Sequence, residues 1–258
     1  MQKITSNLSK IIFKTLKSFA KIRYRKTKII GMEKIPESHT IIVANHAQLN
    51  GPIIAELLMP SDTFIWANGQ MTDYREVPSY AMEDFFPYKT GWARPFYRLA
   101  SYVLAPLMPC VINNARAIPV YHDLRIASTM RNTVRLLAEG KNIMIFPENH
   151  EARNNIVNQF RDRYIDVARL YYKRYRIKLN FLPMYIAPSL NACYLGEAVM
   201  FDPEEDIVEE RHRISEYLVD QITQMGRSLP KHTVTPFDNI SRKLYLSNKD
   251  VEATPLKR

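Results

Sequence analysis

His46 is the residue of this sequence whose type and position best fit acid–base chemistry. It follows the apolar run Thr40–Ala44 and precedes the turn-forming residues Asn50-Gly51-Pro52. The run predicts a buried strand that ends just before the histidine. Ligands of open α/β sheets bind at the carboxyl ends of strands, so His46 is a candidate general base. A histidine with a purely structural role is the alternative.

A second block, Ile143–His150, has the same organisation. Its apolar part again predicts a buried strand. The strand is followed by Pro147, by the carboxylate of Glu148 and by a second histidine, His150. A carboxylate and a histidine after a strand strengthen the interpretation of His46 as part of a site.

These two blocks resemble motifs of the glycerophospholipid acyltransferases, the family that contains the 1-acylglycerol-3-phosphate acyltransferases. The first family motif is Asn-His, four free positions, then Asp. Asn45 and His46 match it, and Gly51 stands at the Asp position. The third motif is Phe-Pro-Glu-Gly; residues 146–148 match, and Asn149 replaces the glycine.

Two weaker blocks extend the resemblance. Ala117–Tyr121 is similar to the second family motif, with His122 at the position of its arginine and Arg125 about one helical turn further on. Phe181–Tyr185 is similar to the fourth, an apolar strand with a central proline. The order and spacing of all four blocks agree with the family over roughly residues 30–205.

The resemblance implies transfer of an acyl group from a thioester, acyl-CoA or acyl carrier protein, to a hydroxyl of a glycerolipid-type acceptor such as a lysolipid. His46 would accept the hydroxyl proton, so neither an enzyme nucleophile nor a cofactor is required. Asn45 would shape the turn, and Glu148 would bind or order the acceptor. The remaining candidates for substrate binding are Arg116, His122, Arg125, Asn149, His150 and Arg153. Of these, the arginines and His122 are candidates for binding an anion. The alternative for each of those four is a solvated charge on the surface with no role in binding.

Gly51 is a departure from the family pattern that bears on the chemistry. In the family, the Asp at this position hydrogen-bonds the second imidazole nitrogen and stabilises the imidazolium. Asn50 offers an amide oxygen for this role, although a neutral amide stabilises an imidazolium less. Glu148, or one of Asp73, Glu83 and Asp84, is another candidate. A catalytically weak or inactive relative that binds lipid or acyl thioester is therefore the alternative function. A hydrolase is disfavoured because no Gly-x-Ser-x-Gly elbow is present.

The first 31 residues form a basic, amphipathic segment. They contain nine Lys or Arg and no Asp or Glu, so nearly all of the net charge of +10 lies here. Apolar residues from Ile4 to Ile22 recur at helical spacing and predict a helix that lies on an anionic membrane surface. A helix docked on the domain and a nucleic-acid-binding arm are the alternatives, and the apolar stripe argues against nucleic acid. The expected location is the cytoplasmic face of a membrane, peripheral or monotopic.

The rest of the chain alternates predicted strands and helices. The expected fold is a single α/β domain over residues 31–228, with a central, mostly parallel sheet flanked by helices. We expect helices at 52–59, 123–139, 158–176 and 204–226, an insertion or lid at 68–95, and a loosely packed tail at 229–258. Leu99–Ile112 is nearly uncharged but too short and too broken by proline to span a bilayer. The two cysteines predict reduced core residues, and no motif suggests a metal.

Overall fold

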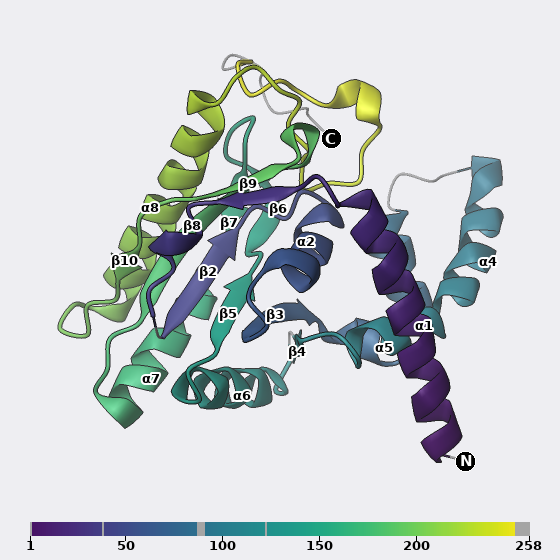
Figure 1. The fold of residues 1–258 in the computed structure, drawn as a ribbon, viewed down its shortest axis with the longest axis horizontal. Coiled ribbons are helices and arrows are strands. Elements are labelled where there is room, and N and C mark those ends of the chain that lie inside the picture. Colours follow the sequence, from purple (N-terminus) through teal and green to yellow (C-terminus); the bar gives the residue numbers. More distant parts are fainter. Residues whose placement is uncertain (1, 38, 87–90, 122, 251–258) are drawn as a thin grey trace.

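The computed structural model describes residues 2–37, 39–86, 91–121 and 123–250, and for residues 2–6 the backbone alone. Its centre is one mixed sheet in the order β1-β9-β8-β2-β5-β3-β4, with β10 paired to β8 (Figure 1). Neighbouring strands are parallel except for β8 with β9 and β10 with β8. The predicted α/β fold with a mostly parallel sheet is therefore confirmed.

The middle strands are continuous apolar runs, as expected of strands that are covered on both faces. The strands of the sheet are β1 (Lys28–Ile30), β2 (Thr40–Ala44), β3 (Thr63–Asn68), β4 (Ala117–Val120), β5 (Asn142–Ile145), β8 (Asn180–Ala187), β9 (Ala192–Leu195) and β10 (Val199–Met200). Side chains of β2 alternate between two hydrophobic clusters: Ile41 and Val43 belong to one, Ile42 and Ala44 to the other. All five residues of β2 are buried, so the strand is a fixed support for the histidine that follows it.

Helices cover both faces of the sheet. The first cluster is completed by α6 (Ile126–Ala138), α7 (Asp166–Tyr175) and α8 (Ile207–Ser228), and the second by α2 (Asn50–Leu58). The long N-terminal helix α1 (Gln2–Arg23) extends beyond the sheet, with its carboxyl end near α2 and its body beside α5 (Leu107–Ile112) (Figure 1). Between β3 and β4 lie the short helix α3 (Val77–Tyr80), a π-helical turn at Ala81–Phe85, and α4 (Arg94–Leu104).

One described segment, Gly91–Ile112, is long and apolar enough to cross a membrane by length and composition, and only 11% of it is buried. It is longer than the expected stretch because α4 begins well before Leu99. The segment is bent rather than straight, since Pro106 separates α4 from α5.

Two expectations about the second half of the chain are wrong. Residues 158–176 were expected to form one helix, but β7 (Asn158–Phe160) pairs with β6 (Glu148–Ala152) in a separate hairpin, and α7 begins only at Asp166. Within this hairpin the side chain of Glu148 also accepts a hydrogen bond from the backbone N–H of Asn158 at 2.9 Å, which helps to hold residue 158 in the strand. Local helical periodicity does not predict such a bond.

Residues 229–250 are packed against the domain and do not form the expected loose tail. His232 and Asn248 are buried, and the His232 ring accepts from or donates to the Tyr185 hydroxyl at 2.8 Å. Antiparallel backbone bonds join the two ends of this segment, from Val234 N–H to Leu246 C=O and from Asn248 N–H to His232 C=O. Residues 251–258 of the expected tail lie outside the described residues.

Candidate active site

His46 lies in a tight turn directly after β2. Asn45 anchors the start of this turn, because its buried side chain both donates to Ile186 C=O and accepts from Ile186 N–H, at 3.1 and 2.7 Å. The chain then folds back through Ala47 and Gln48, whose φ angles of 46° and 56° are both left-handed. Such angles cost non-glycine residues about 1–3 kcal/mol each and cluster at functional sites.

The folded-back turn places a backbone carbonyl on the imidazole of His46. Nδ1 of His46 lies 2.5 Å from the carbonyl oxygen of Gln48. A carbonyl can only accept, so Nδ1 carries the proton. The neutral ring then has its lone pair on Nε2, for which no hydrogen-bond partner is present among the described residues. This is the tautomer that a general base acting through Nε2 requires.

Glu148, the first residue of β6, reaches the same turn from just beyond the end of β5, the strand beside β2. Its Oε2 accepts from His46 N–H at 2.5 Å and its Oε1 accepts from Asn158 N–H. Both carboxylate oxygens therefore accept hydrogen bonds from backbone N–H groups. The partner of Nδ1 of His46 is the Gln48 carbonyl and not this carboxylate. Burial raises the pKa of Glu148 to about 7, and the charge of Asp238 acts in the same direction, while the two backbone bonds oppose the shift.

The imidazole of His46 has aromatic rings on two sides. Phe146 and Phe237 both meet it edge-on, with ring centroids 5.3 and 5.7 Å away. Burial lowers the pKa of His46, against smaller opposing effects of the Gln48 carbonyl and the charge of Asp84. The neutral form that a base needs is therefore favoured near neutral pH.

Asp84 is the candidate acid of the insertion whose charge acts on His46. It lies in the π-helical turn and accepts from the Tyr80 hydroxyl at 2.7 Å. Asp73, by contrast, accepts from Arg75 N–H, and Glu83 from the Ser79 hydroxyl. Asp84 thus acts on the imidazole through the field of its charge, with no hydrogen bond between them.

Asn50 does not orient His46, contrary to expectation. Its Oδ1 accepts from the Tyr24 hydroxyl at 2.7 Å, and its Nδ2 donates to Ala47 C=O at 2.8 Å. The amide is used to hold the first turn of α2, so it is unavailable to the imidazole. Gly51 follows in tight contact with the same turn: a Cβ placed there would lie 2.5 Å from the His46 carbonyl oxygen and 2.8 Å from the Phe146 ring.

The anion-binding candidates do not gather around His46. Arg116 precedes β4 and so lies at the amino-terminal edge of the sheet, where it donates to Pro60 C=O and Glu56 C=O. Arg125 is at the carboxyl-terminal edge, but β4 is three strands from β2, or roughly 14 Å at the usual strand spacing. Its guanidinium is paired with Asp123. Arg153 is paired with Glu216 of α8, and His122 lies outside the described residues.

Asn149 and His150 lie in the β6–β7 hairpin beside Glu148. The Asn149 side chain accepts from Glu151 N–H, so it shapes the hairpin. His150 is half exposed, and its Nδ1 lies 2.7 Å from Oδ1 of Asp238. His150 also meets Phe237 edge-on, so it contacts the same ring that covers His46.

The residues that sequence reasoning missed come from the packed C-terminal segment. Phe237 covers the imidazole, and Gln48 donates through Nε2 to the Asp238 carbonyl and to the Tyr245 hydroxyl, at 3.0 and 2.7 Å. In Figure 1 this segment, in yellow, returns over the upper edge of the sheet, toward β6 and α2. The segment has no hydrophobic period, so its sequence gives no signal that it reaches His46.

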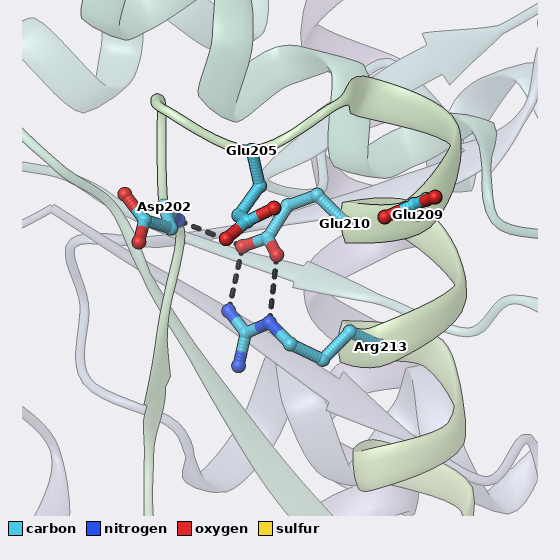
Figure 2. A pocket seen from close by; sticks show the side chains of 5 residues that line it. All are labelled: Asp202, Glu205, Glu209, Glu210 and Arg213. Carbon is cyan, nitrogen blue, oxygen red and sulfur yellow. Dashed lines mark hydrogen bonds and ion pairs between the residues drawn. The ribbon is translucent and has the colours of Figure 1, made fainter.

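An acidic hollow lies near the amino-terminal end of β8, at the opposite end of the strands from His46, and is unrelated to this site. Figure 2 shows it lined by Asp202, Glu205, Glu209, Glu210 and Arg213. Strand β10, which precedes Asp202, pairs with the start of β8, whereas His46 follows the end of β2. The buried Glu210 carboxylate is already satisfied by Arg213 and Asp202 N–H. Among the described residues, no group of three or more His, Cys, Asp or Glu could hold a metal ion.

Comparison with known proteins also points to the region that contains His46 and Glu148. The family model described as Acyltransferase matches residues 26–188, which include both His46 and Glu148. The chain belongs to the acyltransferase family. The enzyme class expected from the sequence is thereby confirmed, and the protein is an acyltransferase.

A solved structure also resembles the chain. The 1-acyl-sn-glycerophosphate (LPA) acyltransferase PlsC from Thermotoga maritima has 15% sequence identity to it and a TM-score of 0.46. The match covers 84% of this acyltransferase and 80% of the bacterial one. No curated protein sequence matches the chain.

Proposed function

We propose that this acyltransferase moves an acyl group from an acyl thioester, acyl-CoA or acyl carrier protein, to a hydroxyl of a glycerolipid acceptor. His46 acts as the general base. Its Nε2 takes the proton of the acceptor hydroxyl as that oxygen attacks the thioester carbonyl, and the thiolate of the donor leaves. The observation that carries the proposal is the Nδ1 contact with the Gln48 carbonyl, which leaves the lone pair on Nε2.

The remaining site residues support this base without touching the reacting atoms. Asn45 and Glu148 fix the backbone on either side of the imidazole. Phe146 and Phe237 pack edge-on against the ring and restrict its rotation. No cofactor is needed, because the thioester supplies the activated acyl group.

The reaction is proposed to take place at an anionic membrane surface, on its cytoplasmic face. Helix α1 contacts the domain along a mixed side: Lys17 pairs with Glu56, Ser9 accepts from Asn114, and Ile12, Phe13 and Ala20 are partly buried. Most of its apolar stripe points away from this side, and Leu8, Ile11, Phe19 and Ile22 are 57–67% exposed. A docked helix would instead bury this stripe, so the arrangement favours insertion into the membrane interface.

A second exposed stripe lies on and before α4. Trp92, Phe96, Leu99 and Val103 recur at helical spacing and are 64–92% exposed. The segment Gly91–Ile112 contains arginines but no acid, which suits an anionic lipid surface. Two exposed apolar stripes on α1 and α4 give the protein two points of attachment, peripheral or monotopic.

Purified protein with acyl-CoA or acyl carrier protein and a panel of lysolipid acceptors tests the reaction. His46→Ala is expected to lower the rate of thioester consumption by 10²–10⁴-fold. His212→Ala is the matched control, because His212 lies on α8 outside the site, and it should keep the wild-type rate. No thioester consumption with any acceptor, or an equal rate in the wild type and His46→Ala, would refute the proposal and leave a lipid- or thioester-binding protein.

A further inference from the structure

The C-terminal residues Pro236–Tyr245 form a loop whose two ends are held together. The bridge between Thr233 and Ser247 and the backbone bond from Val234 to Leu246 close its base. Asn248 is fully buried and fixes the stem by donating to Gly226 C=O. Such a compact loop with adjacent ends is a rigid unit and not a tail. We call residues 236–245 the C-terminal loop.

The two ends of the C-terminal loop contact the turn that carries His46 in three ways. Phe237 meets the imidazole edge-on. The Asp238 carbonyl and the Tyr245 hydroxyl both accept from the side-chain amide of Gln48. The loop is also fixed from the other side, because Asn239 donates to the carbonyl of Asp84 and the Asp238 carboxylate contacts His150.

Gln48 needs such support because its backbone is left-handed. At φ 56° a non-glycine residue is strained, and Ala47 before it is strained as well. This conformation directs the Gln48 carbonyl back to Nδ1 of His46. Two consecutive strained residues persist only where the surroundings fix them, and the bonds to the Gln48 amide supply that restraint.

We propose that the C-terminal loop is a positioning element for the base of this acyltransferase. It acts through Gln48: Tyr245 and Asp238 hold the Gln48 side chain, and the Gln48 carbonyl then accepts a hydrogen bond from the Nδ1–H of His46. The carbonyl thus does the orienting that the resemblance assigns to a carboxylate at position 51. The inference that the loop affects catalysis rests on the proposed role of His46 as the base. The claim that the loop selects the tautomer of the His46 ring can be tested without that role.

Two substitutions test the proposal. Gln48→Met keeps the length of the side chain and removes both bonds, and Tyr245→Phe removes one of them from a half-buried ring. We expect kcat to fall about tenfold in Gln48→Met and about threefold in Tyr245→Phe, with KM changed less than twofold. Because both act through one contact, the double variant should be no slower than Gln48→Met. Tyr217 lies on α8, and Tyr217→Phe removes the bond from its hydroxyl to the Glu197 carbonyl; this variant is the matched control and should keep the wild-type kcat.

The ring tautomer supplies a readout that does not depend on activity. In protein labelled with ¹⁵N histidine, the wild type should show His46 protonated at Nδ1, with the signal assigned by its loss in His46→Ala. Gln48→Met should shift this signal toward the other tautomer. An unshifted signal with full kcat in both single variants would overturn the proposal, and so would a double variant whose losses add. Full activity of His46→Ala would instead refute the base, whatever the NMR signal shows.

Discussion

A carboxylate restored at position 51 should not improve this acyltransferase. The resemblance alone suggests the opposite, since an aspartate there orients the base in the family. The backbone leaves no room for an aspartate at this position, because a Cβ on Gly51 would lie 2.5 Å from the His46 carbonyl oxygen and 2.8 Å from Cε1 of Phe146. The closer of these atoms is backbone and cannot rotate away, so the turn itself must open.

The magnitude follows from two opposing terms. Forcing extra atoms into a well-packed site costs about 1–3 kcal/mol. Replacing a helical glycine by alanine stabilises the helix by about 1 kcal/mol. The net effect of Gly51→Ala should therefore be a free energy of unfolding lower by about 1 kcal/mol. For a chain of this size the corresponding fall in Tm is about 2–4 °C. Opening of the turn also moves His46, and a misplacement of about 1 Å costs on the order of 10²-fold in rate.

The assay compares Gly51→Ala and Gly51→Asp with the wild type in thermal unfolding and in thioester consumption. The two variants share the same Cβ, so any difference between them reports the carboxylate alone. Both are expected to be slower than the wild type. A Gly51→Asp enzyme faster than the wild type would show that the glycine is a defect and that the Gln48 carbonyl is not the working partner of His46.

Three further predictions concern the support of the site and its surroundings. Asn45→Ala should cost about 2–3 kcal/mol in urea unfolding, because it leaves two buried backbone groups without partners. The folded pKa of Glu148, about 7, lies above the ordinary value of 4.5 for a glutamate. Its contribution to stability is therefore full below pH 4.5 and is lost as pH rises through 7. The lowered pKa of His46 acts in the opposite direction over the same range, so the test is a difference: from pH 5 to pH 8 the free energy of urea unfolding should fall more, or rise less, in the wild type than in Glu148→Gln. Replacing Phe96 and Leu99 by Ser should reduce flotation with anionic vesicles at unchanged Tm, whereas Val208→Ser, equally exposed on α8, should float like the wild type.

The parts of the fold that sequence predicts best are those with a strong local pattern. Thr40–Ala44 and Asn142–Phe146 are dense apolar runs, and both form buried strands close to the expected bounds. Gly140 ends the helix α6 in a left-handed conformation, as a glycine just beyond a helix predicts. His46 and Glu148 follow such strands, so their proximity follows from the pattern.

The parts that sequence misses depend on contacts that local periodicity does not encode. Asn158 belongs to a strand that pairs with β6, where Glu148 also binds its N–H, and no helical period contains that information. Arg116 looks like an anion-binding group by charge alone, but it lies before its strand and so at the opposite edge from His46. Phe237 and Tyr245 are about 190 residues from the histidine turn that they contact. Nothing in the spacing of these residues indicates that contact.

The difference between a carbonyl and a carboxylate on Nδ1 has a consequence for the charge that forms in catalysis. Both accept a hydrogen bond from Nδ1–H and so select the same tautomer of the neutral ring. Only the carboxylate carries a negative charge to stabilise the imidazolium. Here that charge acts from further away, from Asp84, which raises the pKa of His46 against the larger effect of burial. The acid limb of kcat/KM is therefore expected below pH 6.5. In Asp84→Asn this limb should move to still lower pH, because the opposing charge is removed. A pH profile in which the limb moves upward would show that Asp84 acts on another group.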